Sequence, residues 1–180
     1  MTILKIDSSI TGDNSVSRQL TSAVTDQLRG ANPAADIIER DLVATPLSHL
    51  TLGGSGDQDI LEEFLAADTV VVGAPMYNFT VPSQLKAWID RILVAGKTFR
   101  YTQAGPEGLA GGKRVIVAVS RGGFYDDANA LEHVKTYLSG IFGFIGITPE
   151  FVHADGVNYG PEQRQAGIAN GLAEVERLAA

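Results

Sequence analysis

The segment TVVVGAP, residues 69–75, is the clearest indication of the fold, because its apolar side chains follow one another without alternating with polar ones. This pattern is typical of a strand in a parallel sheet that is covered on both faces. KRVIVAVS, residues 113–120, repeats the pattern. We therefore predict a parallel sheet that lies between two layers of helices.

The rest of the chain alternates β-branched runs with amphipathic ones. Five strands are predicted, at residues 2–7, 35–42, 69–75, 113–120 and 148–156. Helices are predicted at residues 17–30, 57–68, 83–96, 129–142 and 161–179. This alternation indicates an α/β fold, and five strands favour the flavodoxin-like order 2-1-3-4-5 over a six-stranded sheet. We expect a single domain, residues 1–180, built as a three-layer sandwich.

The composition is that of an ordinary globular protein, with 44% hydrophobic and 19% charged residues. No cysteine is present, which excludes disulfides, thiolate metal sites and a cysteine nucleophile. A net charge of −7 disfavours non-specific nucleic-acid binding. No apolar run approaches the ~18 residues of a membrane span, and the first residues do not resemble a signal peptide. We expect a cytoplasmic protein without membrane contact.

Ligands of such a sheet bind beyond the carboxyl ends of the strands, so three loops are candidates for the site. The first, SSITGDNSVS at 8–17, carries several hydroxyls directly before a helix. Hydroxyls and free amides at a helix N-terminus form an anion site, and phosphate is the expected anion. Helix capping alone needs only one of these hydroxyls. The loop has no Gly-x-Gly-x-x-Gly motif, which argues against a dinucleotide.

The second loop, PMYNFTVP at 75–82, combines apolar side chains with the amide of Asn78. The third, SRGGFYDD at 120–127, offers glycine amides that allow close approach of a flat ligand, although a tight turn also accounts for them. A phosphate site, an amide-rich edge and apolar walls together describe a mononucleotide with a large flat ring. FMN fits this description best.

Residues 96–112 are too many for a simple helix-to-strand connection, which usually has about 2–6 residues. We predict a functional excursion there, in the form of a small hairpin with a lid role.

Several motifs resemble the FMN-dependent NADH:azoreductase and NADH:quinone oxidoreductase family over nearly the whole chain. They are PMYNF at 75–79, FRYT at 99–102, GPEGL at 105–109, SRGG at 120–123, GFIGIT at 143–148 and YGPE at 159–162. The resemblance implies a flavodoxin-like homodimer with FMN at the interface. The implied FMN contacts are Ser9, Ser15, Val16 and Ser17 at the phosphate, Pro75, Met76, Tyr77, Asn78 and Phe79 along the ring, and Ser120, Arg121, Gly122 and Gly123 on its pyrimidine side.

Tyr101 and Phe144 resemble the aromatic residues that shape the family's substrate pocket, from the two different subunits, and we add Tyr125 to that pocket. The chain departs from the family at residues 48–59, where the loop beside the substrate mouth is shorter. This departure bears on the range of substrates.

The resemblance also implies the reaction. NADH passes a hydride to FMN and leaves, and a quinone or an azo compound then takes its place and is reduced. The flavin carries this ping-pong chemistry, so we assign no catalytic side chain, and the sequence offers no metal site. The alternative is a flavodoxin-type FMN electron carrier without a substrate pocket. The excursion at 96–112 favours an enzyme.

Overall fold

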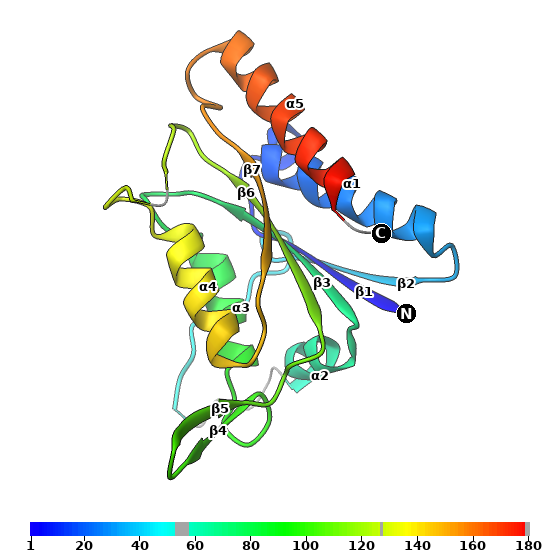
Figure 1. The fold of residues 1–180 in the computed structure, drawn as a ribbon, viewed down its shortest axis with the longest axis vertical. Coiled ribbons are helices and arrows are strands. Elements are labelled where there is room, and N and C mark those ends of the chain that lie inside the picture. The colour runs from blue at the N-terminus through cyan, green and yellow to red at the C-terminus, as the bar shows by residue number, and fades with distance from the viewer. Residues whose placement is uncertain (53–57, 127, 179–180) are drawn as a thin grey trace.

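A computed structural model describes residues 1–52, 58–126 and 128–178. Five parallel strands form the main sheet in the order β2-β1-β3-β6-β7 (Figure 1). Because β4 and β5 form a separate two-stranded sheet, this order is the predicted 2-1-3-4-5, and that prediction is confirmed. The strands of the main sheet are β1 (Thr2–Asp7), β2 (Asp36–Asp41), β3 (Thr69–Pro75), β6 (Arg114–Ser120) and β7 (Glu150–Ala154).

Helices cover both faces of the sheet, as predicted. Figure 1 shows α1 and α5 together on one face, with α2, α3 and α4 on the other. Their bounds are α1 Val16–Ala31, α2 Gln58–Ala66, α3 Ser83–Ile92, α4 Val134–Phe144 and α5 Pro161–Arg177. All seven residues of β3 are buried between these layers, which explains why its sequence lacks alternation.

The strand register aligns the carboxyl ends of the central strands. Pro75, the last residue of β3, pairs with Ser120, the last residue of β6. The next residue continues the pairing, because the Met76 amide donates to the Ser120 carbonyl at 2.8 Å. The loops that follow β3 and β6 therefore start side by side at one edge of the sheet.

Two helices have an end that differs from the prediction by more than two residues. Helix α4 begins at Val134 rather than near residue 129, because Glu132 accepts hydrogen bonds from the backbone amides of Lys135 (3.0 Å) and Thr136 (3.3 Å) and so caps the first turn. Helix α3 ends at Ile92 rather than 96, because the Thr98 hydroxyl donates to the Ile92 carbonyl at 2.6 Å.

The excursion after α3 is a hairpin, as predicted, made of antiparallel strands β4 (Phe99–Thr102) and β5 (Gly105–Gly108). It packs against the end of α4, where the Ala110 amide donates to the Ile145 carbonyl at 3.0 Å. The approach is close, since a Cβ on Gly108 would overlap the backbone of Gly146. The hairpin therefore depends on a glycine at its contact with α4.

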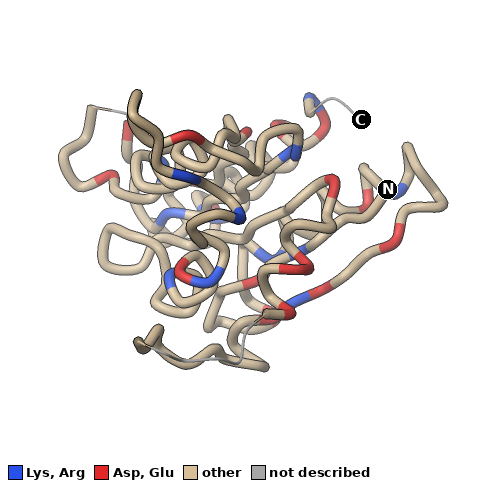
Figure 2. Tube along the Cα trace, turned by 90° about the horizontal axis from the view of Figure 1, so that it is seen from below, with Lys and Arg blue, Asp and Glu red and all other residues tan. Residues whose placement is uncertain are grey.

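Acidic and basic residues are interspersed along the trace (Figure 2). Among the described helices, none is long and apolar enough to cross a membrane. Within the same part of the chain, no group of three or more His, Cys, Asp or Glu side chains is placed to hold a metal ion. The centre of the shortened loop at 48–59, position 127 of the third loop and position 179 of the last predicted helix lie outside the described residues.

Candidate functional site

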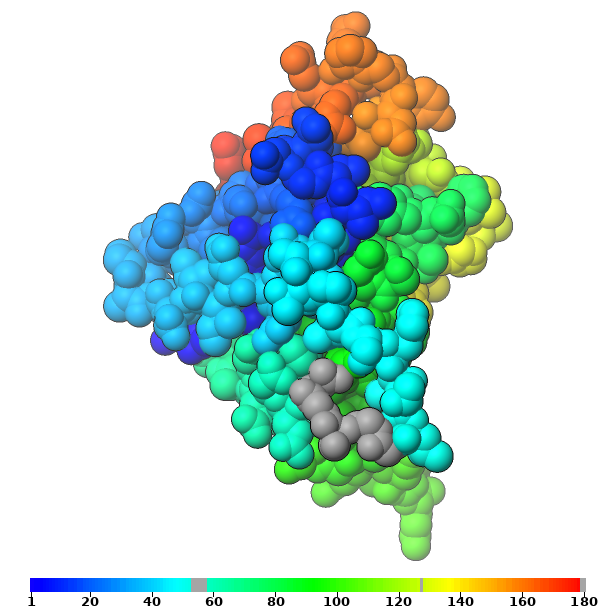
Figure 3. Space-filling view, turned by 180° about the vertical axis from the view of Figure 1, so that it is seen from behind, coloured from blue at the N-terminus to red at the C-terminus, as the bar shows by residue number. Residues whose placement is uncertain are grey.

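A cavity of about 440 Å³ opens at the carboxyl edge of the sheet. All three loops selected from the sequence contribute to it. Figure 3 shows the dark-blue loop after β1 beside the orange connection between β7 and α5. The lining includes eight residues of the predicted FMN set: Ser9, Ser15, Val16, Pro75, Met76, Tyr77, Ser120 and Gly122.

The first loop ends in a short 3-10 turn, η1 (Gly12–Asn14), followed directly by α1. Ser15 is the N-cap of α1, and its Oγ accepts a hydrogen bond from the Arg18 amide at 3.2 Å. The Ser17 hydroxyl lies 3.2 Å from Ser15 Oγ but is fully buried and does not line the cavity. Capping and cavity lining thus coincide in Ser15, at the positive end of the α1 dipole.

Tyr77 connects the second loop to the first. Its hydroxyl lies 3.1 Å from Ser9 Oγ and accepts from the Ile10 amide at 3.2 Å. The next two residues, Asn78 and Phe79, have φ values of 48° and 71°, as in a type I′ turn. They are the two non-glycine residues with positive φ in the described part of the chain, and a bulky residue there costs on the order of 1 kcal/mol. Both side chains are exposed outside the cavity.

The third loop is fixed by Arg121, whose side chain is buried and turned away from the cavity. Its guanidinium donates to both carboxylate oxygens of Asp155, at 2.6 and 2.9 Å, and lies 3.5 Å from Glu132. Because Asp155 follows β7 and Glu132 precedes α4, this cluster connects the end of β6 to the end of β7 and to the start of α4.

The two glycines of the third loop are closely covered. A Cβ on Gly122 would lie 2.5 Å from Asn158 Nδ2, and one on Gly123 would lie 3.1 Å from the ring of Tyr125. The Asn158 amide also donates to the Gly122 carbonyl at 3.2 Å. Gly122 lines the cavity, whereas Gly123 and Tyr125 lie outside its lining.

An ion pair between Arg18 and Asp41 holds the first loop in place. Arg18 donates to both carboxylate oxygens of Asp41 at 2.8 Å and to the Ser9 carbonyl at 3.0 Å. The hydrogen bonds from Arg18 lower the pKa of Asp41 to about 2, and the backbone amides of Val43 and Ala44 act in the same direction. The guanidinium of Arg18 thus links the end of β2 to the loop after β1.

Asp7 is a buried carboxylate at the carboxyl end of β1. Burial raises its pKa, although the Thr21 hydroxyl donates to it at 2.8 Å and Lys5 Nζ lies 3.5 Å away. The same residue does not line the cavity. It belongs to the packing between β1 and α1 rather than to the surface that a ligand would meet.

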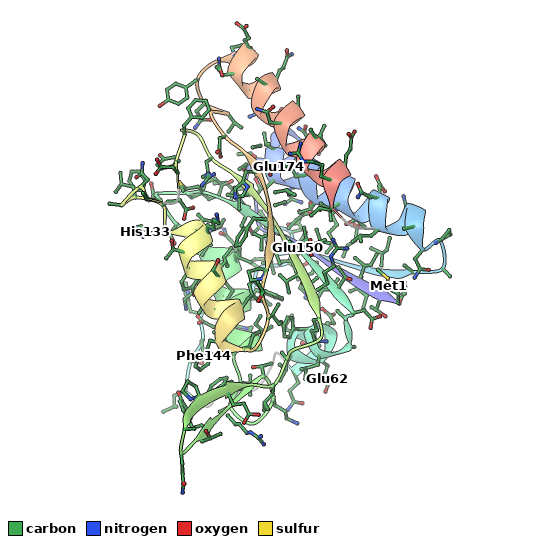
Figure 4. All side chains as sticks on the ribbon, in the orientation of Figure 1. Met1, Glu62, His133, Phe144, Glu150 and Glu174 are labelled. Carbon is green, nitrogen blue, oxygen red and sulfur yellow. The ribbon has the colours of Figure 1, made fainter. Side chains whose placement is uncertain are left out.

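Two of the predicted substrate-pocket aromatics, Tyr101 and Phe144, lie far from this cavity. Tyr101 and Phe144 both pack on Phe99, with ring centroids 5.6 and 4.7 Å from it. Figure 4 labels Phe144 at the end of α4 next to the hairpin and His133 at the other end. The 11 residues of α4 span about 16 Å, so one chain carries both aromatics together at a distance from its own cavity.

Five further residues line the cavity without having been assigned to it from the sequence: Thr11, Asn14, Val157, Asn158 and Arg164. Thr11 and Asn14 belong to the first loop, which was selected as a whole. Val157 and Asn158 belong to the connection between β7 and α5, and Arg164 lies in the first turn of α5 that follows it. That connection also leaves the carboxyl end of a parallel strand, so the topological rule that selected the other loops applies to it as well.

Comparisons with known proteins agree with this geometry. The profile described as "Flavodoxin-like fold" matches residues 1–179. The chain is 53% identical to FMN-dependent NADH:quinone oxidoreductase 2 of Bradyrhizobium diazoefficiens over 201 residues, covering 100% of both chains. It is 56% identical to FMN-dependent NADH:quinone oxidoreductase of Rhizobium meliloti, covering 94% of this chain and 92% of the relative.

A solved structure shows the same fold. An azoreductase from Bacillus anthracis str. Sterne superposes with a TM-score of 0.87 at 30% identity, covering 97% of this chain and 96% of that one. The matches extend over the sheet, the helices and the hairpin rather than over one motif. The chain therefore belongs to the flavodoxin-like family of FMN-dependent NADH:quinone oxidoreductases and azoreductases.

Proposed function

We propose that residues 1–180 form one domain that binds FMN in the cavity at the carboxyl edge and uses NADH to reduce quinones and azo compounds. The observation that carries the proposal is the polarity of the cavity. One end has the serine hydroxyls and the N-terminus of α1, and the other has Met76, Tyr77 and the backbone of Gly122. A phosphate and a flat heteroaromatic ring require these two environments in this order.

The cavity suits such a ligand in size and in donors. Its volume of about 440 Å³ falls within the ~300–1,000 Å³ of cofactor pockets. Ser9 and Ser15 supply hydroxyls at the anion end, and the Val16 amide belongs to the first turn of α1. Gly122 lets the third loop pack closely against the connection between β7 and α5, because a Cβ there would meet Asn158 Nδ2 at 2.5 Å. The donors present therefore fit FMN.

The residues of the chain then have separate tasks. Bound FMN supplies hydride transfer, while the protein orients it and excludes water. Tyr77 fixes the distance between the first loop, at the phosphate end, and the second loop, at the ring end, through its contacts with Ser9 and Ile10. We assign Asn78, Phe79, Ser120, Arg121 and Gly123 to the ring end through their backbone, because the described side chains of Asn78, Phe79 and Arg121 point elsewhere.

We further propose that the enzyme is a cytoplasmic homodimer. Tyr101 is 75% exposed at the tip of an aromatic cluster that its own cavity does not use. A second copy could place this cluster over the flavin ring. Because Tyr101 and Phe144 both pack on Phe99 of one chain, one subunit would then supply both of them to the pocket of the other, rather than one from each subunit as the resemblance implies. Tyr125 would complete that pocket from the subunit that holds FMN.

The visible spectrum of the purified protein tests the cofactor, and NADH oxidation with a quinone tests the reaction. We expect flavin bands, bleaching by NADH, and recovery on addition of the quinone. Bands without bleaching by NADH would indicate an electron carrier of the flavodoxin type instead. A protein that neither retains nor takes up FMN would refute the proposal as a whole.

A further inference from the structure

Arg164 is the only charged side chain among the described residues that line the cavity. The other polar groups around it are neutral hydroxyls and amides, such as Ser9, Thr11 and Asn14. The chain as a whole carries a net charge of −7. A dianionic ligand in this cavity therefore meets one compensating positive charge from its walls, and that charge comes from the first turn of α5.

The position of Arg164 is fixed by two contacts. Its backbone amide donates to the Gly160 carbonyl at 3.0 Å, which places it in the first turn of α5. Its Nη2 donates to the Asn14 carbonyl in the turn that precedes Ser15. The side chain is half-buried, and its contact with Asn14 links α5 to the first loop. A guanidinium has five N–H donors, which leaves further donors for a ligand in the cavity.

The neighbouring arginine, in the first turn of α1, is already engaged. Arg18 makes a two-point ion pair with Asp41 and donates to the Ser9 carbonyl, and it does not line the cavity. The α1 N-terminus adds only about half a positive charge. Arg164 is thus the side chain placed to neutralise a phosphate that the serines hydrogen-bond.

We propose that Arg164 binds the phosphate of the flavin and makes the site selective for FMN over riboflavin, an inference that rests on the proposed function. Arginine suits this task because its planar donors match phosphate oxygens at two points. Its contact with Asn14 at the same time holds the first loop in place. The selectivity should therefore reside in α5 as well as in the serine-rich loop.

The experiment compares FMN and riboflavin binding to flavin-free protein by quenching of flavin fluorescence. In Arg164→Gln we expect the Kd for FMN to rise about tenfold or more, a typical effect of losing a charge-assisted hydrogen bond, while the Kd for riboflavin stays unchanged. The salt dependence of FMN binding should weaken in parallel. Inorganic phosphate should compete with FMN less well in Arg164→Gln than in the wild-type protein.

Two further variants make the result specific. Arg177→Gln removes an equal charge from the last turn of the same helix and should change neither Kd. Arg164→Lys keeps the charge and should retain most of the salt dependence. Equal FMN affinity in wild type and Arg164→Gln, or an equal loss for FMN and riboflavin, would overturn this inference alone. A wild-type protein that binds no FMN would instead overturn the proposed function, and this inference with it.

Discussion

The cavity and the aromatic hairpin lie at opposite ends of α4 and are built in different ways. The cavity is formed by four connections, and these are fixed to one another by Tyr77, Arg121 and Arg164. The hairpin is one excursion that contacts the end of α4 and exposes Tyr101. The cavity follows from the topology of one chain, because it lies between strand ends. The exposed aromatic residues of the hairpin, in contrast, need a partner that covers them before they can have a function.

Among the substitutions that test this difference between the cavity and the hairpin, Gly108→Ala should have the largest effect on stability. The added Cβ would overlap the backbone of Gly146, which cannot rotate away, so we expect a loss of about 3 kcal/mol in the free energy of unfolding. Urea denaturation measures it. Gly140→Ala in α4 is the matched control, since no atom lies within 4 Å of its Cβ, and it should stabilise the protein by roughly 0.5–1 kcal/mol. A similar midpoint for both variants would contradict the close packing of the hairpin.

At the cavity, Gly122→Ala should be milder, because the added Cβ meets the end of a side chain, Asn158 Nδ2, at 2.5 Å. We expect stability to change little and the affinity for FMN to fall about tenfold, or roughly 1.4 kcal/mol. Fluorescence titration of the flavin-free protein measures this. Adding Asn158→Ala should recover part of the loss, and strictly additive effects of the two substitutions would argue against the steric explanation.

Tyr101→Ala tests whether the hairpin acts on another chain. Because the side chain is 75% exposed, stability should stay within about 0.5 kcal/mol of wild type, and FMN content should not change. If the partner's ring covers the flavin, kcat/KM for a quinone falls about fivefold, or roughly 1 kcal/mol. Steady-state kinetics and light scattering measure this. A monomer with full activity would rule out the homodimer.

The smallest changes in stability are expected at two arginine–carboxylate pairs of similar geometry. Arg18 donates to Asp41 at 2.8 Å, and Arg100 donates to the exposed Glu107 on the hairpin at 2.8 and 3.0 Å. Asp41→Asn should cost roughly 0.5 kcal/mol at pH 7, discounted because the Asp41 side chain is 37% exposed. Glu107→Gln should cause no measurable change.

The pH dependence of the Asp41 effect has a definite sign. Its pKa is lowered to about 2 from an unfolded value of about 3.9, so the ionised carboxylate stabilises the fold fully above the unfolded value. That contribution decreases as the pH falls through 3.9 towards 2. The stability difference between wild type and Asp41→Asn should therefore shrink over this range in denaturation experiments. A difference independent of pH would exclude the ion pair as its cause.

The sequence was sufficient for the strand order and for the three loops of the cavity, because unalternating strands such as 69–75 require helices on both faces and the topology then selects the loops. It was not sufficient for side-chain direction. SRGG is a recognisable motif, but nothing local indicates that Arg121 turns to Asp155, 34 residues later. The start of α4 was also missed, since Glu132 in the range 129–142 is compatible with either a helix or its cap.

Nor does local sequence connect Arg164 with Asn14, because their contact depends on how α5 packs beside α1. Contacts between residues far apart in sequence depend on the complete fold, whereas capping and strand patterns are local. This explains why the hydroxyls of the first loop were predictable and the charge opposite them was not.

The contact between Asn14 and Arg164 joins residues 150 positions apart. During synthesis at roughly 5–20 residues per second, Asn14 leaves the ribosome about 8 to 30 s before Arg164. The serine-rich loop is thus made early, but its partner from α5 arrives only after most of the sheet has been translated. A nascent chain lacks the contact between Arg164 and Asn14 during this interval. Full FMN affinity should therefore appear late in synthesis, when α5 packs against α1.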